Sequence, residues 1–248
     1  MNRNLSKIVV IPARYGSTRF PGKPLAQING KPLIYWVVKR AEELRSIDKI
    51  IVATDHLKIF QAVSELTNAQ PVMTPSDLAS GSDRVAWVAG KSRADIVVNL
   101  QGDEPLFDVA AVQEGLNYLE NNPRQNVVTL AAPLHNSEDW QNPNVVKVLL
   151  NELGEAIYFS RSPIPHFRDS AFAPLPVLRK HVGIYIYRKE FLLKYSQMPP
   201  SPLENAEKLE QLRILEAGYS LYVVRSEFES VGVDCPEDLE KVKNILKE

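Results

Sequence analysis

The sequence predicts an α/β fold with a Rossmann-like, mostly parallel sheet flanked by helices and a smaller antiparallel lobe inserted into it. In the first half, short β-branched apolar runs alternate with stretches of helical periodicity, as in βαβ units. Residues 136–188 instead show strand-like runs with little helix between them and prolines before the last run. The chain has 248 residues, enough for one full-sized domain with an insertion. We therefore expect a single domain over residues 1–248, with the lobe at about 136–188.

The alternation of strands and helices is found in the first half of the sequence. Unbroken apolar runs of this kind are typical of strands covered on both faces, and they predict strands at residues 7–11, 49–55, 71–74, 94–105 and 126–134. Helical spacing of apolar residues predicts helices at residues 32–44, 59–66, 85–91 and 110–120. Pro32 suits the first position of its helix.

The second half begins with the lobe, where strands are expected at residues 145–150, 156–161 and 180–188. Residues 204–218 then read as one strong helix, with leucines in step and Gly218 beyond its end. A strand at 219–226 and a last helix from Pro236 complete the pattern.

The composition excludes several function classes. Apolar residues make up 44% and the formal net charge is −1, which is typical of a globular protein and not of a partner for long nucleic acids. One cysteine excludes an internal disulfide and a cysteine-based zinc site. No apolar run approaches the roughly 20 residues of a membrane span, and the N-terminal apolar stretch is too short for a signal peptide. We expect no membrane insertion and a cytoplasmic location.

Four polar segments follow predicted strands, and in open α/β sheets ligands bind at the carboxyl ends of strands. They are the loop at residues 12–25 and residues 53–55, 74–84 and 101–105. We expect them to converge at one edge of the sheet.

The loop at residues 12–25 carries Arg14, Arg19 and Lys23. It is not a Walker loop, because five residues separate its glycines and Pro24 follows Lys23. Cations and glycine amides after the first strand favour a site for a phosphate chain. The alternative interpretation is a solvated basic turn.

Other candidates each have a structural alternative. Asp103 suits magnesium, which takes one or two carboxylates and keeps several waters, but it could also be a turn residue. Asp234 reads first as an acid at a helix start, and as a metal ligand only if the strand before it lies beside the strand that leads to Asp103. Ser80 could cap a helix or read a nucleobase. His181 reads as a structural histidine, or as part of an anion site with Arg161 and Arg168.

Eight segments, in order, resemble the sugar-acid cytidylyltransferase family, and within it the enzymes for 3-deoxy-manno-octulosonate (Kdo). They are IPARYGSTRFPGKPL, IIVATD, SGSDR, NLQGDEP, YFSRSPIP, KHVGIYIYR, LEQLRILE and GVDCPEDLE. The resemblance implies a nucleotidyltransferase that uses CTP, Kdo and Mg²⁺ to make CMP-Kdo and pyrophosphate for lipopolysaccharide biosynthesis. It also implies a homodimer formed through the lobe.

The resemblance assigns roles to individual residues, with Lys23, Asp103 and Asp234 as the catalytic set. The residues implied for the triphosphate are Arg14, Ser17, Arg19 and Lys23. Those implied around the cytidine are Pro12, Ala13, Ser80, Gly81 and Gln101. Those implied for the sugar pocket are Gln101, Glu104, Arg161, His181, Tyr185, Glu210 and Gln211. The metal would be held by Asp103 and Asp234.

Some positions depart from the family pattern. Ile186 stands where glycine is common, Ala206 where isoleucine is frequent, and Cys235 in place of threonine. Ile186 should point to the strand face opposite Tyr185, which predicts a packing change. Glu104 favours Kdo over its 8-amino analogue. Sialic acid as the sugar, a metal-dependent glycosyltransferase and a non-catalytic nucleotide-binding module are the alternatives.

Overall fold

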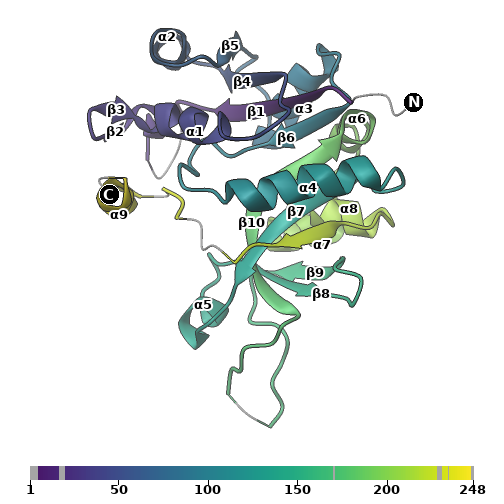
Figure 1. Ribbon diagram of the computed structural model, residues 1–248. Coiled ribbons are helices and arrows are strands. Elements are labelled where there is room, and N and C mark those ends of the chain that lie inside the picture. Colours follow the sequence, from purple (N-terminus) through teal and green to yellow (C-terminus); the bar gives the residue numbers. More distant parts are fainter. Residues whose placement is uncertain (1–4, 17–19, 170, 228–230, 234, 247–248) are drawn as a thin grey trace.

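The computed structural model describes residues 5–16, 20–169, 171–227, 231–233 and 235–246. One sheet, in the strand order β11-β7-β10-β6-β1-β4-β5, runs through the molecule (Figure 1). Its strands are β1 (Lys7–Ala13), β4 (Lys49–Thr54), β5 (Gln70–Met73), β6 (Ile96–Asn99), β7 (Val127–Pro133), β10 (Leu178–Arg188) and β11 (Tyr222–Arg225). The predicted fold class is therefore confirmed.

Strand direction divides this sheet. β5, β4, β1 and β6 are mutually parallel, so their carboxyl ends share one edge. β10 is antiparallel to both β6 and β7. The first part of β10 also pairs with β8 (Lys147–Leu150), which pairs with β9 (Ala156–Ser160). The long strand β10 thus belongs to both the central sheet and the antiparallel lobe and connects them.

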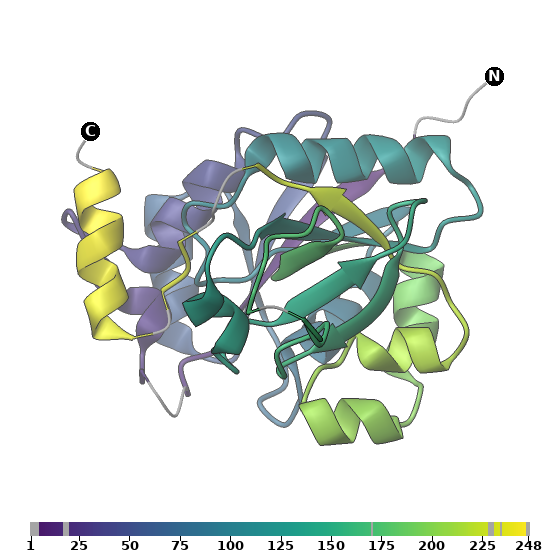
Figure 2. The ribbon, with the colours of Figure 1, turned by 90° about the horizontal axis from the view of Figure 1, so that it is seen from below.

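Helices cover both faces of the sheet (Figures 1 and 2). One face packs against α1 (Leu33–Ala41), α2 (Leu57–Leu66) and α4 (Val109–Asn121). The other packs against α3 (Gly81–Gly90), α6 (Lys189–Ser196) and α8 (Leu212–Glu216). Two apolar layers result, and they explain why the parallel strands read as unbroken apolar runs.

The predicted helix at residues 204–218 is wrong. The structure has α7 (Pro202–Glu207) and α8, separated by Lys208 in the left-handed region at φ 54°. The helical spacing of leucines continues across this break because Leu209 and Leu212, on either side of it, pack into the same core layer. The spacing alone therefore did not reveal the break. The break exposes Glu210 to the cavity described below. Two short helices, α5 (Ser137–Gln141) and α6, were not predicted.

The C-terminal helix α9 (Pro236–Ile245) returns to the N-terminal part of the fold, beside the small antiparallel pair β2 (Gln27–Ile28) and β3 (Lys31–Pro32) (Figures 1 and 2). Leu239 and Val242 of α9 share a small core with Ile28, Leu33 and Leu106. This packing brings the C-terminal helix to the segments that follow β1 at the carboxyl edge of the sheet, whereas the start of β1 lies on the opposite side of the molecule. None of the helices within the described residues is long and apolar enough to cross a bilayer.

Candidate active site

Lys23 lies at the start of a single 3-10 turn, η1 (Lys23–Leu25), at the end of the cationic loop. Its Nζ is 2.6 Å from Oδ2 of Asp103, which follows β6, and 2.9 Å from the carbonyl oxygen of Val233. In the same loop, Nη2 of Arg14 is buried and has no hydrogen-bond partner among the described residues. A buried guanidinium nitrogen with no partner is a binding group available to an anion.

Close backbone contacts join the loops after β1 and β6. A Cβ atom at Gly102 would lie 2.8 Å from the carbonyl oxygen of Pro12, so this position requires glycine. A Cβ atom at Gly81 would touch the ring of Pro12 at 3.6 Å. The structure thus brings together Pro12, Gly81 and Asp103 from three of the four segments predicted to converge.

The segment at residues 231–233, here called the C-terminal arm, lies against Asp103. The backbone N–H of Val233 donates a 2.8 Å hydrogen bond to the carbonyl oxygen of Asp103. Val233 precedes Asp234, which lies outside the described residues, as do Ser17 and Arg19. The N-cap of α9 is Cys235, whose N–H donates to the Asp238 carboxylate at 3.1 Å. The substituted cysteine therefore occupies a capping position.

A cavity of about 250 Å³ opens beside these loops. Its wall is built from the start of α3, the end of β6, the middle of β10 and the break between α7 and α8. Lining residues that the sequence predicted are Gly81, Gln101, Tyr185, Glu210 and Gln211. Gln101 is fixed there, since its Nε2 donates a 3.2 Å hydrogen bond to the Gly183 carbonyl oxygen.

Two side chains at the helix break are available for a polar ligand. Gln211 is 4% exposed, and its Nε2 has no hydrogen-bond partner among the described residues. Burial raises the pKa of the Glu210 carboxyl above its usual range, a shift opposed by its hydrogen bond with Ser82. Unpaired or desolvated polar groups of this kind favour a ligand that supplies complementary hydroxyls.

The cavity also contains residues that the sequence analysis missed. Tyr187 and Tyr195 extend a row of stacked rings from Tyr185, with centroid separations of 5.7 and 6.2 Å. Lys208 contributes a cation to the lining. The alternation of tyrosines in KHVGIYIYR could have indicated that Tyr187 lies beside Tyr185. Tyr195 and Lys208 reach the cavity only through the packing of α6 and α7, which no local pattern indicates.

Three predicted sugar residues lie outside this lining. Glu104 faces Gly232 of the C-terminal arm, where a Cβ atom would lie 3.0 Å from its Oε1. Nε of Arg161 donates to the Glu207 carbonyl oxygen at 2.9 Å. Nε2 of His181 lies 3.0 Å from the hydroxyl oxygen of Thr129, and burial lowers its pKa to about 3. His181 is therefore neutral near pH 7.

Ser80 caps α3. Its hydroxyl oxygen accepts a 3.0 Å hydrogen bond from the N–H of Asp83, whose carboxylate accepts one from the N–H of Ser80. Of the two roles considered for Ser80, the structure shows the cap.

A buried arginine ties the neighbouring loops together, and the sequence analysis did not single it out. Arg84 is fully buried, and its Nη2 donates a 2.9 Å hydrogen bond to the carboxylate of Asp55. The other oxygen of Asp55 accepts a hydrogen bond from the N–H of Tyr15 at 3.4 Å, and Arg84 also bonds to Thr74. These contacts hold the loops after β1, β4 and β5 against α3.

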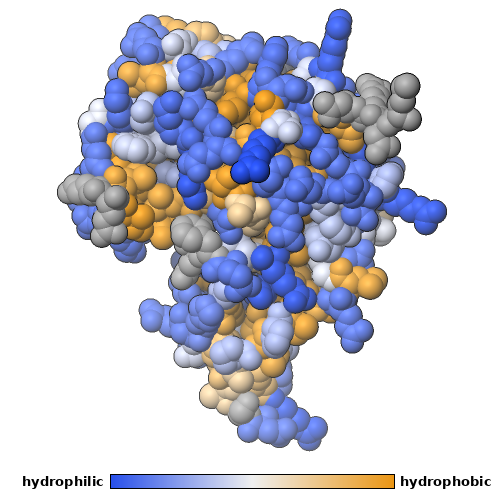
Figure 3. All heavy atoms as spheres, in the orientation of Figure 1, coloured by the Kyte–Doolittle hydropathy of each residue, from blue (hydrophilic) through white to orange (hydrophobic). Residues whose placement is uncertain are grey.

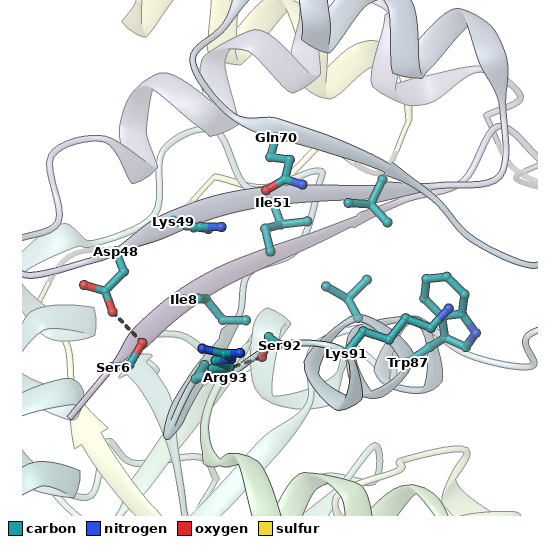
Figure 4. Close-up of a pocket in the computed structure, with 13 residues that line it drawn as sticks. Ser6, Ile8, Asp48, Lys49, Ile51, Gln70, Trp87, Lys91, Ser92 and Arg93 are labelled. Carbon is teal, nitrogen blue, oxygen red and sulfur yellow. Dashed lines mark hydrogen bonds between the residues drawn. The ribbon is translucent and has the colours of Figure 1, made fainter.

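A larger cavity, of about 420 Å³, lies at the other end of α3 (Figure 4). It is lined by apolar residues of the sheet and by Lys49, Lys91, Arg93 and Trp87, and includes none of the predicted site residues. We therefore place the candidate active site at the smaller cavity, where the predicted residues converge.

A magnesium ion fits the oxygen atoms beside Lys23. The Asp103 carboxylate and the Val233 carbonyl already hold one cation, the Lys23 ammonium, and both are the oxygen donors that magnesium prefers. Within the described residues no group of three or more histidine, cysteine or acidic side chains forms a metal cluster. Magnesium needs only one or two carboxylates, and Asp234, the second one assigned to it, lies outside the described residues.

Comparison with known proteins gives consistent results. Residues 8–240 match the sequence profile of the family described as cytidylyltransferase. This chain is 47% identical to the 3-deoxy-manno-octulosonate cytidylyltransferases of Geotalea daltonii and Geobacter sulfurreducens. Each match covers 96% of this chain, and 97% and 98% of the two relatives, respectively. A solved structure of CMP:2-keto-3-deoxy-manno-octonic acid synthetase complexed with CTP is 42% identical over 98% of both chains, with a TM-score of 0.91.

A more distant structure shares the fold alone. The 4-diphosphocytidyl-2C-methyl-D-erythritol synthase of Anaerococcus prevotii superposes with a TM-score of 0.65 at 12% identity.

Proposed function

The chain belongs to the cytidylyltransferase family, among the 3-deoxy-manno-octulosonate cytidylyltransferases, and we infer from this that it transfers CMP from CTP to Kdo. The acceptor is the anomeric hydroxyl of the sugar acid. The products are pyrophosphate and CMP-Kdo, the activated sugar of lipopolysaccharide biosynthesis. The observation that carries this function is the full-length match to the CTP-bound synthetase, together with the cavity that gathers the predicted residues.

The cationic loop is assigned to the nucleotide. Arg14, Ser17, Arg19 and Lys23 hold the triphosphate in this proposal, supported by the unpartnered buried nitrogen of Arg14. Pro12, Ala13, Ser80, Gly81 and Gln101 surround the cytidine. The contact between Pro12 and Gly81 supports this second group.

The cavity is assigned to the sugar acid. Gln101, Tyr185, Glu210 and Gln211 line it, and Glu104, Arg161 and His181 complete the proposed set at its margins. Burial keeps His181 neutral, so His181 serves as a hydrogen-bond partner. The positive charge that meets the sugar carboxylate comes from Arg161, with Lys208 as a further cation in the cavity lining.

Catalysis in this site is mainly positioning and charge neutralisation. The sugar hydroxyl oxygen bonds to the α-phosphorus in line, the bond from the α-phosphorus to the pyrophosphate oxygen breaks, and the hydroxyl proton passes to water. Lys23 stabilises the departing pyrophosphate. Magnesium, held by Asp103 and Asp234, would acidify the sugar hydroxyl and neutralise phosphate charge.

A pyrophosphate-release assay tests this proposal, using CTP or UTP against Kdo, 8-amino-Kdo and sialic acid. We expect release only with CTP, Kdo and a divalent cation together, and a loss of at least about a hundredfold in Asp103→Asn. Lys49→Met, at the opposite end of the sheet, is the control and should retain activity. With a nucleoside diphosphate sugar added as donor, release of a nucleoside diphosphate without pyrophosphate would instead indicate the glycosyltransferase alternative.

A further inference from the structure

Lys23 connects the three segments that meet at Asp103. Its ammonium is 2.6 Å from the Asp103 carboxylate and 2.9 Å from the Val233 carbonyl oxygen. The Lys23 side chain is only 14% exposed, against 33% for Asp103. In the free enzyme the Lys23 ammonium therefore contacts protein oxygens, although its proposed partner is the triphosphate.

The oxygens that hold this ammonium are the ones a divalent cation would use. A carboxylate oxygen in a 2.6 Å contact with an ammonium offers that cation less charge and less room. Two cations at one partly buried carboxylate also repel each other. Binding of a metal at Asp103 is therefore opposed as long as Lys23 remains there.

The local backbone lets the side chain leave without moving the loop. Gly22 is held in the left-handed region at φ 71°, and Pro24 fixes the next turn. The flexible four-carbon stem of Lys23 can then redirect its ammonium by side-chain rotation. A triphosphate, with several negative charges, competes well for it against one carboxylate.

We propose that Lys23 is a placeholder cation that shields Asp103 in the free enzyme and is transferred to the triphosphate when nucleotide binds. Nucleotide binding thereby opens the metal site, and by linkage the metal strengthens nucleotide binding by the same factor. This inference rests on the proposed function, and assigns Lys23 the task of coupling the two ligands.

Mn²⁺ titration followed by electron paramagnetic resonance tests the coupling without turnover. In the absence of nucleotide, Lys23→Met should bind Mn²⁺ at least about tenfold more tightly than the wild type. Lys23→Arg keeps the charge and should bind as weakly as the wild type. Arg14→Met removes another cation of the same loop, whose buried Nη2 bonds to no described residue, and should change the Mn²⁺ affinity by less than about threefold.

Two results overturn the proposal. One is equal Mn²⁺ affinity of the wild type and Lys23→Met without nucleotide. The other is a gain that persists in Lys23→Met/Asp103→Asn, because the effect would then not act through Asp103. Failure of the proposed function looks different: the wild type would bind no Mn²⁺ even with CTP and would release no pyrophosphate.

Discussion

His181 shows how one residue can sit at a site without supplying charge to it. Its ring contacts Phe159 and Tyr185 at centroid distances of 5.0 and 5.5 Å. Its Nε2 lies within hydrogen-bond distance of Thr129, and burial lowers its pKa to about 3 from 6.5. The structure therefore shows the hydrogen-bonded structural group, and a role of His181 in an anion site with Arg161 stays a prediction.

This pKa predicts a dependence of stability on pH. The folded state binds the proton less readily than the unfolded state, so stability present above pH 6.5 is lost as the pH falls toward 3. His181→Gln should lose less stability on acidification, by up to about 1.4 kcal/mol per pH unit in that window. Urea unfolding at several pH values measures this difference. The exposed His135 provides the control, His135→Gln, which should follow the wild type; equal pH dependence in His181→Gln would contradict the prediction.

At the scale of elements, β10 and α4 fit together through a large and a small residue. Ile186 lies in the core layer opposite that of Tyr185, as its place in the strand predicted. A Cβ atom on Gly115 of α4 would lie 2.5 Å from Cδ1 of Ile186 and 3.2 Å from Cγ1 of Val128. The bulk of Ile186, where the family pattern has glycine, is thus accommodated by a glycine on the helix above it.

This packing predicts that Gly115→Ala depends on its partner. In the wild-type background the added methyl overpacks the core and should lower the free energy of unfolding by about 1–3 kcal/mol. In the Ile186→Val background the conflicting Cδ1 is absent and only the 3.2 Å contact with Val128 remains, so the same substitution should cost less, by about 1 kcal/mol or more. A double-mutant cycle by chemical denaturation gives the two values. The same effect in both backgrounds would show that the two positions do not couple.

At the scale of the whole molecule, the lobe projects from the sheet and carries apolar surface (Figures 1 and 3). Leu153 is 74% exposed and Ile157 is 59% exposed, and both lie on or next to β9. β9 pairs with β8 along one side, and on its other side the N–H of Ala156 donates to the carbonyl oxygen of Leu221 beside a bridge between Glu155 and Tyr222. A strand edge that is only partly paired and carries exposed apolar residues is suited to a subunit contact, which supports the homodimer that the resemblance implies.

The dimer can be tested by sedimentation. The wild type should sediment as a dimer, and Leu153→Glu/Ile157→Glu should shift it to monomers because buried charge opposes the contact. Leu57→Glu is a matched control, since Leu57 on α2 is 61% exposed and lies away from the lobe. A wild-type monomer, or dissociation by Leu57→Glu instead, would refute an interface at the lobe.

The site could be predicted only in part. Five of the eleven residues that line the cavity were predicted site residues, because each belongs to a motif, a short run whose residue types reflect its chemistry. Arg84, Tyr195 and Lys208 were missed because their roles depend on contacts with distant segments, such as that between Arg84 and Asp55. The residues assigned to magnesium and to the dimer remain predictions.

The sequence by itself determined the alternation of strands and helices, the cationic loop after β1 and the family. These features depend on neighbours in the chain, which a pattern of residue types records directly. Tertiary structure decided the break at Lys208, which a local leucine repeat concealed, and the contact of Lys23 with Asp103, 80 residues away in sequence. Such contacts arise because parallel strands end at one edge of the sheet and the C-terminal arm folds back to it, so they follow from topology and packing.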